Sequence, residues 1–226
     1  QTEPEVSLPT NTEISSLPDT SQATSTATST PAIGAEQEIA SWTFGRDSDS
    51  DGLTNQEETI LGTDSANTDT DGDSYLDGSE LINLYDPAST GKLVANPAIA
   101  LYENKTFNYS LLYPAAWQIS TNGGDDSVMF KTEDNQFIQA IVQPNVNNQA
   151  LDNWYLEQLN VAAVNESDRA SSNGWQGLKS PDGLNLYLMD NKRNYIFSLS
   201  YSSGGADTLE YFNIFQMMIK SFVLKE

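Results

Sequence analysis

The residues best suited to chemistry in this 226-residue sequence are carboxylates at a regular spacing. Two twelve-residue loops carry carboxylates at positions 1, 3, 5 and 12, namely Asp47, Asp49, Asp51 and Glu58 in the first loop and Asp69, Asp71, Asp73 and Glu80 in the second. Calcium is a hard cation that takes about six to eight oxygen ligands, and a loop with this spacing turns its oxygens toward one point. The spacing therefore predicts a calcium site in each loop.

Other loop positions complete the expected ligand sets. Position 7 is expected to offer its backbone carbonyl, and position 9 a side chain that binds directly or through water. These positions hold Leu53 and Asn55 in the first loop and Tyr75 and Asp77 in the second. Gly52 permits the sharp turn at position 6 of the first loop, whereas Ser74 stands there in the second. Because Ser adopts such a backbone only at some cost, the second site is expected to be more strained or weaker.

Short helices are expected after the loops, over residues 55–61 ending at Gly62 and over residues 78–85 ending before Pro87. The loops start at Asp47 and Asp69, which leaves too little chain between them for two full helix-loop-helix units. This tandem spacing, with Leu61-Gly-Thr-Asp64 between the loops, resembles thrombospondin type 3 repeats, in which acidic segments wrap around calcium ions. The resemblance extends over residues 47–86. It implies two or more calcium ions and adds Asp64, with Asn67 as a further candidate, to the ligands.

A solvated acidic linker without a site is the plain alternative for residues 47–86, which contain no Lys or Arg. Such a linker would not repeat Asp-x-Asp-x-Asp, a residue with a short side chain at position 6 and Glu at position 12 in both copies. Magnesium is less suited than calcium, because its small octahedral sites rarely use so many protein carboxylates. The pattern therefore favours calcium.

Composition restricts the other functions. With 32 acidic and 10 basic residues the formal charge is −22, which argues against nucleic acid or an anionic membrane surface as partner. The absence of Cys and His excludes disulfides, thiolate sites, histidine triads and most zinc catalysis. No apolar run approaches the roughly 18 residues of a membrane span, so no membrane insertion is expected. Because the chain begins at Gln1, we expect a processed, exported protein of the cell surface or the extracellular space.

Residues 1–35 are rich in Ser, Thr and Pro and lack a hydrophobic period, which is typical of a flexible stalk or linker. An alternative is that this segment is held by a neighbouring subunit as an added strand. Residues 36–91 are expected to form the calcium-binding repeat module. At its start, residues 35–44 are expected to form a short helix or cap, whose Ile39, Trp42 and Phe44 cover the first loop.

Residues 96–226 carry most aromatic residues and are expected to form the globular domain. Phe107-x-Tyr-x-Leu-x-Tyr113 alternates strictly before Pro114, which predicts a strand with one buried face. Further strands are expected at 117–119, 128–130, 137–142, 175–179, 184–189 and 195–201, and helices at 151–163 and 209–222. Strands bracketed by two helices predict an α+β fold, an antiparallel sheet flanked by helices.

The segment from Phe107 to Trp117, together with Met217-Met-Ile-Lys-Ser-Phe222, resembles the PsbP-like family. The resemblance covers most of residues 100–226 and implies an antiparallel sheet flanked by helices. Members of that family include an extrinsic subunit of the photosynthetic oxygen-evolving complex and many exported bacterial proteins. The motifs are structural, so the resemblance supplies a fold and no catalytic residues.

These observations together predict a non-enzymatic calcium-binding protein. Its calcium-rigidified connector would present a protein-binding α+β domain, with another protein or copies of itself as partner. One alternative is a structural subunit of an extracellular filament or sheath, with the N-terminal segment inserted into a neighbouring subunit. The other is a polysaccharide-active enzyme that uses carboxylates in a cleft of the C-terminal domain. A nucleophile elbow is absent from the sequence, which favours the non-enzymatic function.

Overall fold

The computed structural model describes residues 42–121 and 123–225. The acidic region contains two short helices, α1 (Asn55–Leu61) and α2 (Asp77–Ile82), followed by the 3-10 helix η1 (Leu93–Ala95). Helix α1 has the predicted bounds. Thr54 and Glu57 form a capping box at its start, and Gly62 ends it in the left-handed conformation with φ 84°. Helix α2 is shorter than predicted because Leu84, shortly after its end, takes a positive φ of 62°.

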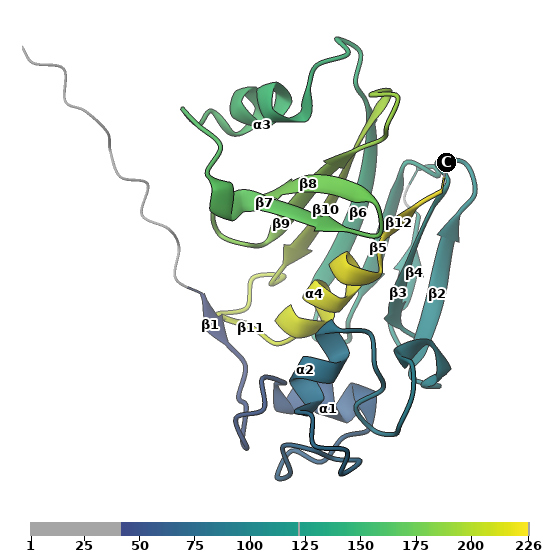
Figure 1. Ribbon diagram of the computed structural model, residues 1–226, viewed down its shortest axis with the longest axis vertical. Helices are drawn as coiled ribbons and strands as arrows, with labels where there is room; N and C mark the ends of the chain where they lie inside the picture. Colours follow the sequence, from purple (N-terminus) through teal and green to yellow (C-terminus); the bar gives the residue numbers. More distant parts are fainter. Residues whose placement is uncertain (1–41, 122, 226) are drawn as a thin grey trace, which may run out of the picture. The chain divides into compact units, whose positions relative to one another are not determined.

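A seven-stranded sheet forms the larger part of the remaining structure (Figure 1). Its strand order is β4-β5-β6-β10-β9-β8-β7, and every neighbouring pair is antiparallel. The strands are β4 (Gln118–Ser120), β5 (Ser127–Lys131), β6 (Phe137–Pro144), β7 (Arg169–Ser172), β8 (Trp175–Lys179), β9 (Asn185–Met189) and β10 (Tyr195–Ser202). All of the predicted strands after residue 115 are therefore confirmed, whereas β7 was not predicted.

A second sheet of three antiparallel strands has the order β12-β3-β2. Its strands are β2 (Ile99–Asn104), β3 (Tyr109–Pro114) and β12 (Val223–Leu224). The prediction of a strand over residues 107–113 with one buried face was wrong in two respects. The strand starts at Tyr109, and side chains on both of its faces are buried, because β3 is the central strand of this sheet and also packs against α4.

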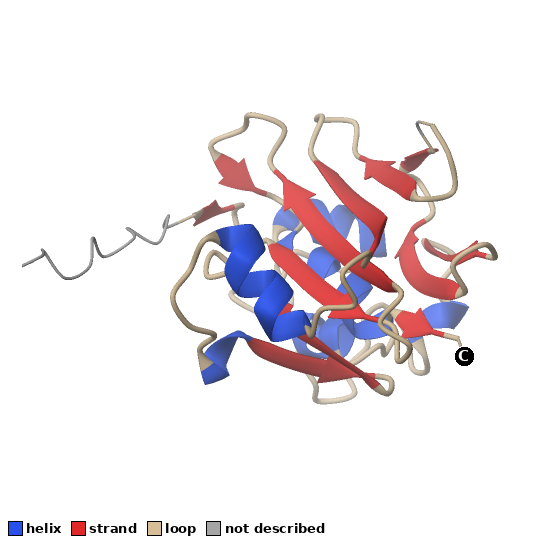
Figure 2. Ribbon diagram, turned by 90° about the horizontal axis from the view of Figure 1, so that it is seen from above, coloured by secondary structure: helices blue, strands red, loops and turns tan. Residues whose placement is uncertain are grey.

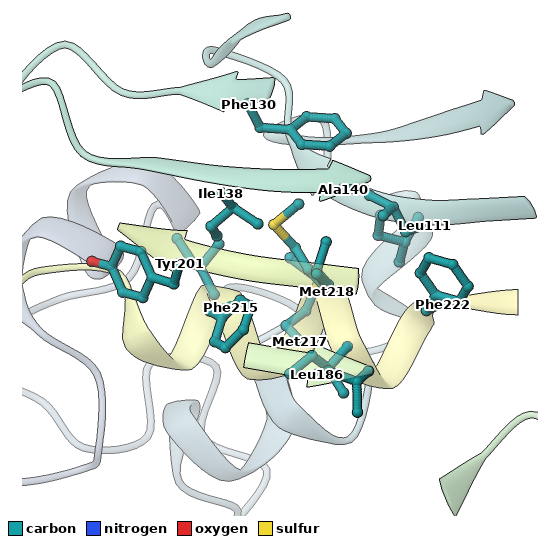
Figure 3. Close-up of a cluster of buried hydrophobic side chains, with 14 of the residues drawn as sticks. Leu111, Phe130, Ile138, Ala140, Leu186, Tyr201, Phe215, Met217, Met218 and Phe222 are labelled. Atoms are coloured by element: carbon teal, nitrogen blue, oxygen red, sulfur yellow. The ribbon is translucent and has the colours of Figure 1, made fainter. Parts of the chain in front are cut away.

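Helix α4 (Phe212–Ser221) supplies the centre of the core (Figure 3). Phe215 lies 5.7 Å from Tyr201 of β10, measured between ring centroids. Phe222, which follows the helix, stacks on Tyr109 of β3 at 5.1 Å. Buried leucines of the acidic region, such as Leu53 and Leu81, belong to the same hydrophobic cluster. The acidic region and the strands that follow it therefore contribute side chains to one hydrophobic cluster, and the domain bounds 36–91 and 96–226 stay a prediction.

Helix α3 (Leu151–Leu159) lies apart from the other helices (Figure 2). It packs against β8 and β9, where the rings of Trp154 and Tyr155 approach Tyr187. Because neighbouring side chains of a strand point to opposite faces, Tyr187 faces away from Leu186, which belongs to the core around α4. Helix α3 therefore covers the other face of the sheet. It ends earlier than predicted, where Asn160 takes a left-handed φ of 53°.

The start of the described chain corrects another prediction. Thr43–Phe44 form β1, which pairs in parallel with β11 (Thr208–Leu209), so these residues are not helical. The expected helix over 35–44 otherwise falls on residues outside the described part. Helix α4 consequently starts at Phe212 rather than Leu209. None of the helices in the described part of the chain is long and apolar enough to cross a membrane. The predicted α+β class with an antiparallel sheet is confirmed.

Candidate calcium centre

The first acidic loop gathers its three aspartates at one point. Asp47, Asp49 and Asp51 each offer a carboxylate oxygen, and these oxygens lie within 4.8 Å of one another. The loop is shaped by its own backbone: Asp47 Oδ1 accepts a hydrogen bond from the Ser50 N–H at 2.7 Å, and Asp47 Oδ2 accepts one from the Gly52 N–H at 3.0 Å. A carboxylate oxygen has two lone pairs, so these bonds leave capacity for a cation.

The second loop repeats this arrangement further along the chain. Asp69, Asp71 and Asp73 bring oxygens within 4.8 Å of one another. Asp69 Oδ1 accepts a hydrogen bond from the Gly72 N–H at 2.9 Å, and Asp69 Oδ2 accepts one from the Ser74 N–H at 2.8 Å. The two loops are therefore one structural motif used twice.

The position 9 residues close both loops. Asn55 Oδ1 accepts a hydrogen bond from the Ser48 N–H at 3.1 Å, and Asp77 Oδ1 accepts the equivalent bond from the Thr70 N–H at 2.8 Å. Asp77 Oδ2 also accepts a bond from Thr70 Oγ1 at 2.6 Å. Sequence spacing predicted Asn55 and Asp77 as ligands, and the structure shows that their side chains accept hydrogen bonds from within the loop. Each could keep these bonds and still bind a cation through a bridging water.

Buried carboxylate oxygens without hydrogen-bond partners are the feature that points to a cation. Glu58 is 1% exposed, and neither of its carboxylate oxygens has a partner among the described residues. Asp49 Oδ1, Asp49 Oδ2 and Asp51 Oδ2 share this property in the first loop, as do Asp71 Oδ2 and Glu80 Oε2 in the second. Burying an anionic oxygen without a partner is costly, and a calcium ion would satisfy these groups. The donor set, made of oxygens alone, fits that ion.

Some carboxyl groups of the two loops have raised pKa values, among them Glu58, Glu80 and Asp51. Burial, and then the charges of Asp49 and Asp51, raise the pKa of Glu58 to about 7. Burial, and then the charges of Asp73 and Asp71, raise the pKa of Glu80 to about 7. The pKa of Asp51 rises to about 6, mainly through burial. Without a cation, these carboxyl groups are therefore partly protonated near neutral pH, and protons compete with a cation for their oxygens.

The two loops also contact each other. Gly78, in the first turn of α2, lies so near the first loop that a Cβ atom there would be 2.6 Å from the Asp51 carbonyl oxygen. Any residue larger than glycine would therefore displace the backbone of one loop. The charge of Asp77 raises the pKa values of both Asp51 and Glu58, which shows that the second loop acts on the carboxylates of the first.

The predicted ligands Asp64, Leu53 and Tyr75 differ in how far they are exposed. Asp64 is exposed and lies outside the cluster of Asp69, Asp71 and Asp73. Its Oδ1 accepts a hydrogen bond from the Ala66 N–H. The residues with expected carbonyl ligands follow the third aspartate of each loop. Leu53 is fully buried, whereas Tyr75 is 64% exposed. The first loop is thus the more enclosed of the two, and the expected difference in strength between the sites stays a prediction.

Sequence reasoning missed Glu57, which anchors the first loop to the rest of the structure. Glu57 is fully buried, and its Oε2 accepts hydrogen bonds from the Thr54 N–H at 3.0 Å and from Asn213 Nδ2 at 3.2 Å. Its Oε1 accepts a bond from the Ile214 N–H, in the first turn of α4, at 2.8 Å. One carboxylate therefore caps α1 and α4 together. The capping-box spacing Thr54-x-x-Glu57 signalled the first of these roles, whereas only tertiary structure reveals the second.

Strain in the second loop leads to a stability prediction. Ser74 takes a φ of 80° and Ser50 a φ of 68°, whereas Gly52 and Gly72 occupy the other left-handed positions of the loops. We expect Ser74→Gly to stabilise the folded chain by roughly 0.5–1 kcal/mol, because glycine adopts this backbone without steric cost. Denaturant unfolding in saturating calcium measures this change. Ser79→Gly, inside α2, is the control and should destabilise the folded chain. Equal effects of the two variants on the free energy of unfolding would contradict strain at Ser74.

The raised pKa values lead to a pH prediction for the metal-free chain. A carboxyl group whose pKa is raised by folding stabilises the fold below its unfolded pKa, near 4, and this contribution is lost as the pH rises through the folded value. The thermal midpoint in chelator is therefore expected to fall between about pH 4.5 and pH 7.5, where Asp51, Glu58 and Glu80 lose their protons. Calcium should bind more tightly at the upper end and release protons. A flat or rising metal-free midpoint in circular dichroism would contradict this assignment.

Comparison with known proteins leaves the identity of the acidic region open. No family model matches the chain, and no curated protein matches it. The resemblance of residues 47–86 to thrombospondin type 3 repeats therefore stays a prediction. The structure is similar to the solution structure of cyanobacterial PsbP (CyanoP) from Synechocystis sp. PCC 6803, with 13% identity and a TM-score of 0.36 over 62% of this chain and 99% of that chain. The cyanobacterial protein is a PsbP, the family that the Phe107–Trp117 motif resembles, and its similarity to this chain concerns the fold alone.

Proposed function

We propose that this chain is a non-enzymatic calcium-binding protein of the cell surface or the extracellular space. Its two acidic loops hold two or more calcium ions in the manner of thrombospondin type 3 repeats. The bound ions fix α1 and α2 against α4, and the α+β domain presents its surface to another protein. The observation that carries this proposal is Glu58, a carboxylate 1% exposed beside Asp49 and Asp51, whose two oxygens have no hydrogen-bond partner in the described part of the chain.

The donor chemistry supports calcium over other cations. All candidate side chains offer oxygen, and the chain has no His or Cys to attract zinc or copper. The first loop holds four carboxylates that could face one ion, more than magnesium usually accepts from protein. Sites of this kind in extracellular modules work at calcium concentrations of roughly 0.1–1 mM. This range agrees with a location outside the cell.

Calcium would act on the domain itself as well as on a connector. Thr54, which caps α1, donates its hydroxyl hydrogen to the Glu210 carbonyl at 2.6 Å, and Asn213 of α4 donates to the Gly52 carbonyl. The first loop is thus joined on both sides to the start of α4, whose side chains fill the core. Neutralising the loop carboxylates would remove their mutual repulsion, and the ordered loop would then support the start of α4.

The non-enzymatic part of the proposal has its own support. Among the described residues, every carboxyl group with a raised pKa lies in the acidic region, in or beside the two loops. A hydrolase with a carboxylate pair would place such a group in a cleft of the α+β domain. The perturbed carboxylates instead gather where a cation would use them.

Isothermal titration of the metal-free chain with calcium chloride tests the proposal. We expect two or more binding events with dissociation constants of roughly 10⁻⁴ to 10⁻³ M, each accompanied by proton release at pH 6.5. Magnesium at equal concentration serves as the competing cation and should bind at least about tenfold more weakly. Absence of binding heat together with unchanged mobility on adding chelator would refute the proposal.

A further inference from the structure

A groove of about 1030 Å³ lies at the ends of strands from both sheets, away from the acidic loops. Three turns line it, those of the β2–β3, β7–β8 and β9–β10 connections, together with the end of β12. Phe107 and Tyr195 form part of its apolar wall, with ring centroids 5.3 Å apart in an edge-to-face arrangement. Tyr195 is 37% exposed, so the wall is accessible. The groove therefore combines an aromatic surface with an opening between two sheets.

The lining of the groove holds two lysines and one carboxylate, in a chain that is strongly negative. Lys192 and Lys225 both line it, although the sequence has only 10 basic residues against 32 acidic ones. The carboxylate in the lining, Asp190, accepts hydrogen bonds from the backbone N–H groups of Lys192 and Tyr195 and thereby shapes the turn. Lys225 forms an exposed ion pair with Glu103. An acidic partner that entered here would find two lysines in the lining of one groove.

An edge strand borders the groove. Strand β12 stands at the end of the order β12-β3-β2, and its Leu224 lines the groove. The start of β12 is covered, because Asn173 Nδ2 and Trp175 Nε1 donate to the Phe222 carbonyl at 3.0 and 2.8 Å. The stretch beyond this cover adjoins the groove. An edge strand beside a groove is the arrangement that receives an extended peptide as an additional strand.

The chain itself contains a segment of matching chemistry. Residues 1–45 have no Lys or Arg, and their first part reads Glu3-Pro-Glu-Val-Ser-Leu8. In an extended conformation, Val6 and Leu8 would point to one side and Glu5 and Ser7 to the other. The apolar side suits the aromatic wall, and the acidic side suits the lysines. Pro4 lies within this stretch and Pro9 follows it, and proline is tolerated in a strand that adds to an edge.

We propose that the groove between β12 and the β9–β10 turn binds the acidic N-terminal segment of a second copy of this chain, residues 3–8, as an added edge strand. The interaction is heterologous, since a donor segment meets an acceptor groove, so it propagates from copy to copy unless a ring closes. It goes beyond the calcium function and uses a different surface. It also gives an acceptor site to the filament alternative that the sequence left open.

Sedimentation velocity and peptide binding test this proposal with the full-length chain in calcium. We expect mass-average size to grow between about 10 and 500 µM protein, and a fluorescent peptide of residues 1–20 to bind. Reversing the charge of both groove lysines, in Lys192→Glu with Lys225→Glu, should weaken peptide binding at least about tenfold and shift self-association to higher concentration. Lys131→Glu, on β5 outside the groove lining, is the matched control and should leave both unchanged.

A charge swap separates recognition from misfolding. A peptide carrying Glu3→Lys and Glu5→Lys is expected to bind the doubly reversed chain better than the native chain, which a misfolded variant would not show. The neutral pair Lys192→Gln and Lys225→Gln should give an intermediate affinity. Peptide affinity that is the same for the native and reversed chains, or a monomer at every concentration, would overturn the proposal. So would preferential binding of a polygalacturonate fragment in place of the peptide, since the groove would then be a glycan site.

Discussion

Saturating calcium is expected to raise the thermal unfolding midpoint of the metal-free chain by roughly 10–20 °C. A ligand present at about one hundred times its dissociation constant stabilises the folded state by about 2.7 kcal/mol per site, which gives about 5 kcal/mol for two sites. For a domain of this size, each kcal/mol moves the midpoint by about 2–4 °C. Differential scanning calorimetry with calcium and with chelator measures the shift.

Variants of Glu58 and Glu80 divide this shift between the loops. Glu58→Gln should remove about half or more of the calcium-dependent gain, because it neutralises a buried carboxylate whose oxygens have no protein partner among the described residues. Glu80→Gln should remove a smaller share, since the second loop is more exposed. In chelator, Glu58→Gln should equal or exceed the native chain in stability, because an uncompensated buried charge is gone. Glu133→Gln, an exposed carboxylate outside both loops, is the control; an equal calcium shift in all three variants would contradict the assigned sites.

Glu57→Ala is expected to destabilise the chain by roughly 3–5 kcal/mol with or without calcium. The substitution leaves the N–H groups of Thr54 and Ile214 without their acceptor and removes the amide contact to Asn213. Each unsatisfied buried donor costs about 1–3 kcal/mol, and the loss of a helix cap alone costs about 0.5–2 kcal/mol. Chemical denaturation in excess calcium gives the free energy of unfolding directly.

The neighbouring residue supplies the control for this prediction. Gln56→Ala, at an exposed position of α1, should change the free energy of unfolding by less than about 0.5 kcal/mol. Glu57→Gln should lie between the two, because an amide still accepts one of the hydrogen bonds. A Glu57→Ala variant as stable as Gln56→Ala would show that the start of α4 does not depend on this carboxylate.

Local signals explain the parts of the fold that the sequence predicted well. Helix α1 begins and ends where expected, because Thr54 caps its start and Gly62 provides the left-handed residue at its end. Strands β6, β8 and β10 follow the predicted runs closely, since their side chains alternate between the core and the other face. In each case the deciding interactions lie within a few residues of the signal.

Tertiary contacts explain what the sequence did not predict. Strand β2 carries Leu101, which is 54% exposed, while the neighbouring Tyr102 packs on the core, so its hydrophobic pattern gives no clear alternation. The predicted helix over 209–222 loses its first turn because Leu209 pairs with Phe44 in a parallel strand pair. Phe44 and Leu209 are 165 residues apart in the sequence, and a partner so distant leaves no local trace.

The candidate site divides in the same way. The Asp-x-Asp-x-Asp spacing predicted which side chains come together. In each loop, one carboxylate oxygen from each of the three aspartates lies within 4.8 Å of the other two. The spacing did not predict that Asp77 would direct both carboxylate oxygens to Thr70, because that depends on the path of the folded loop. Calcium as the bound ion stays a prediction, and so do the ligand roles of all the predicted residues, Leu53, Tyr75 and Asp64 included.

The short pair of β1 and β11 determines how the folded part would respond to mechanical load. Tension applied through the chain before Trp42 reaches Thr43 and Phe44 first, where this short pair and the bond from the Gly45 N–H to the Leu209 carbonyl resist it. The first acidic loop follows immediately in sequence, ahead of α1. A pulling force would therefore break this short strand pair and then act on the first acidic loop, where the proposed calcium ion would raise the force at which the core begins to yield.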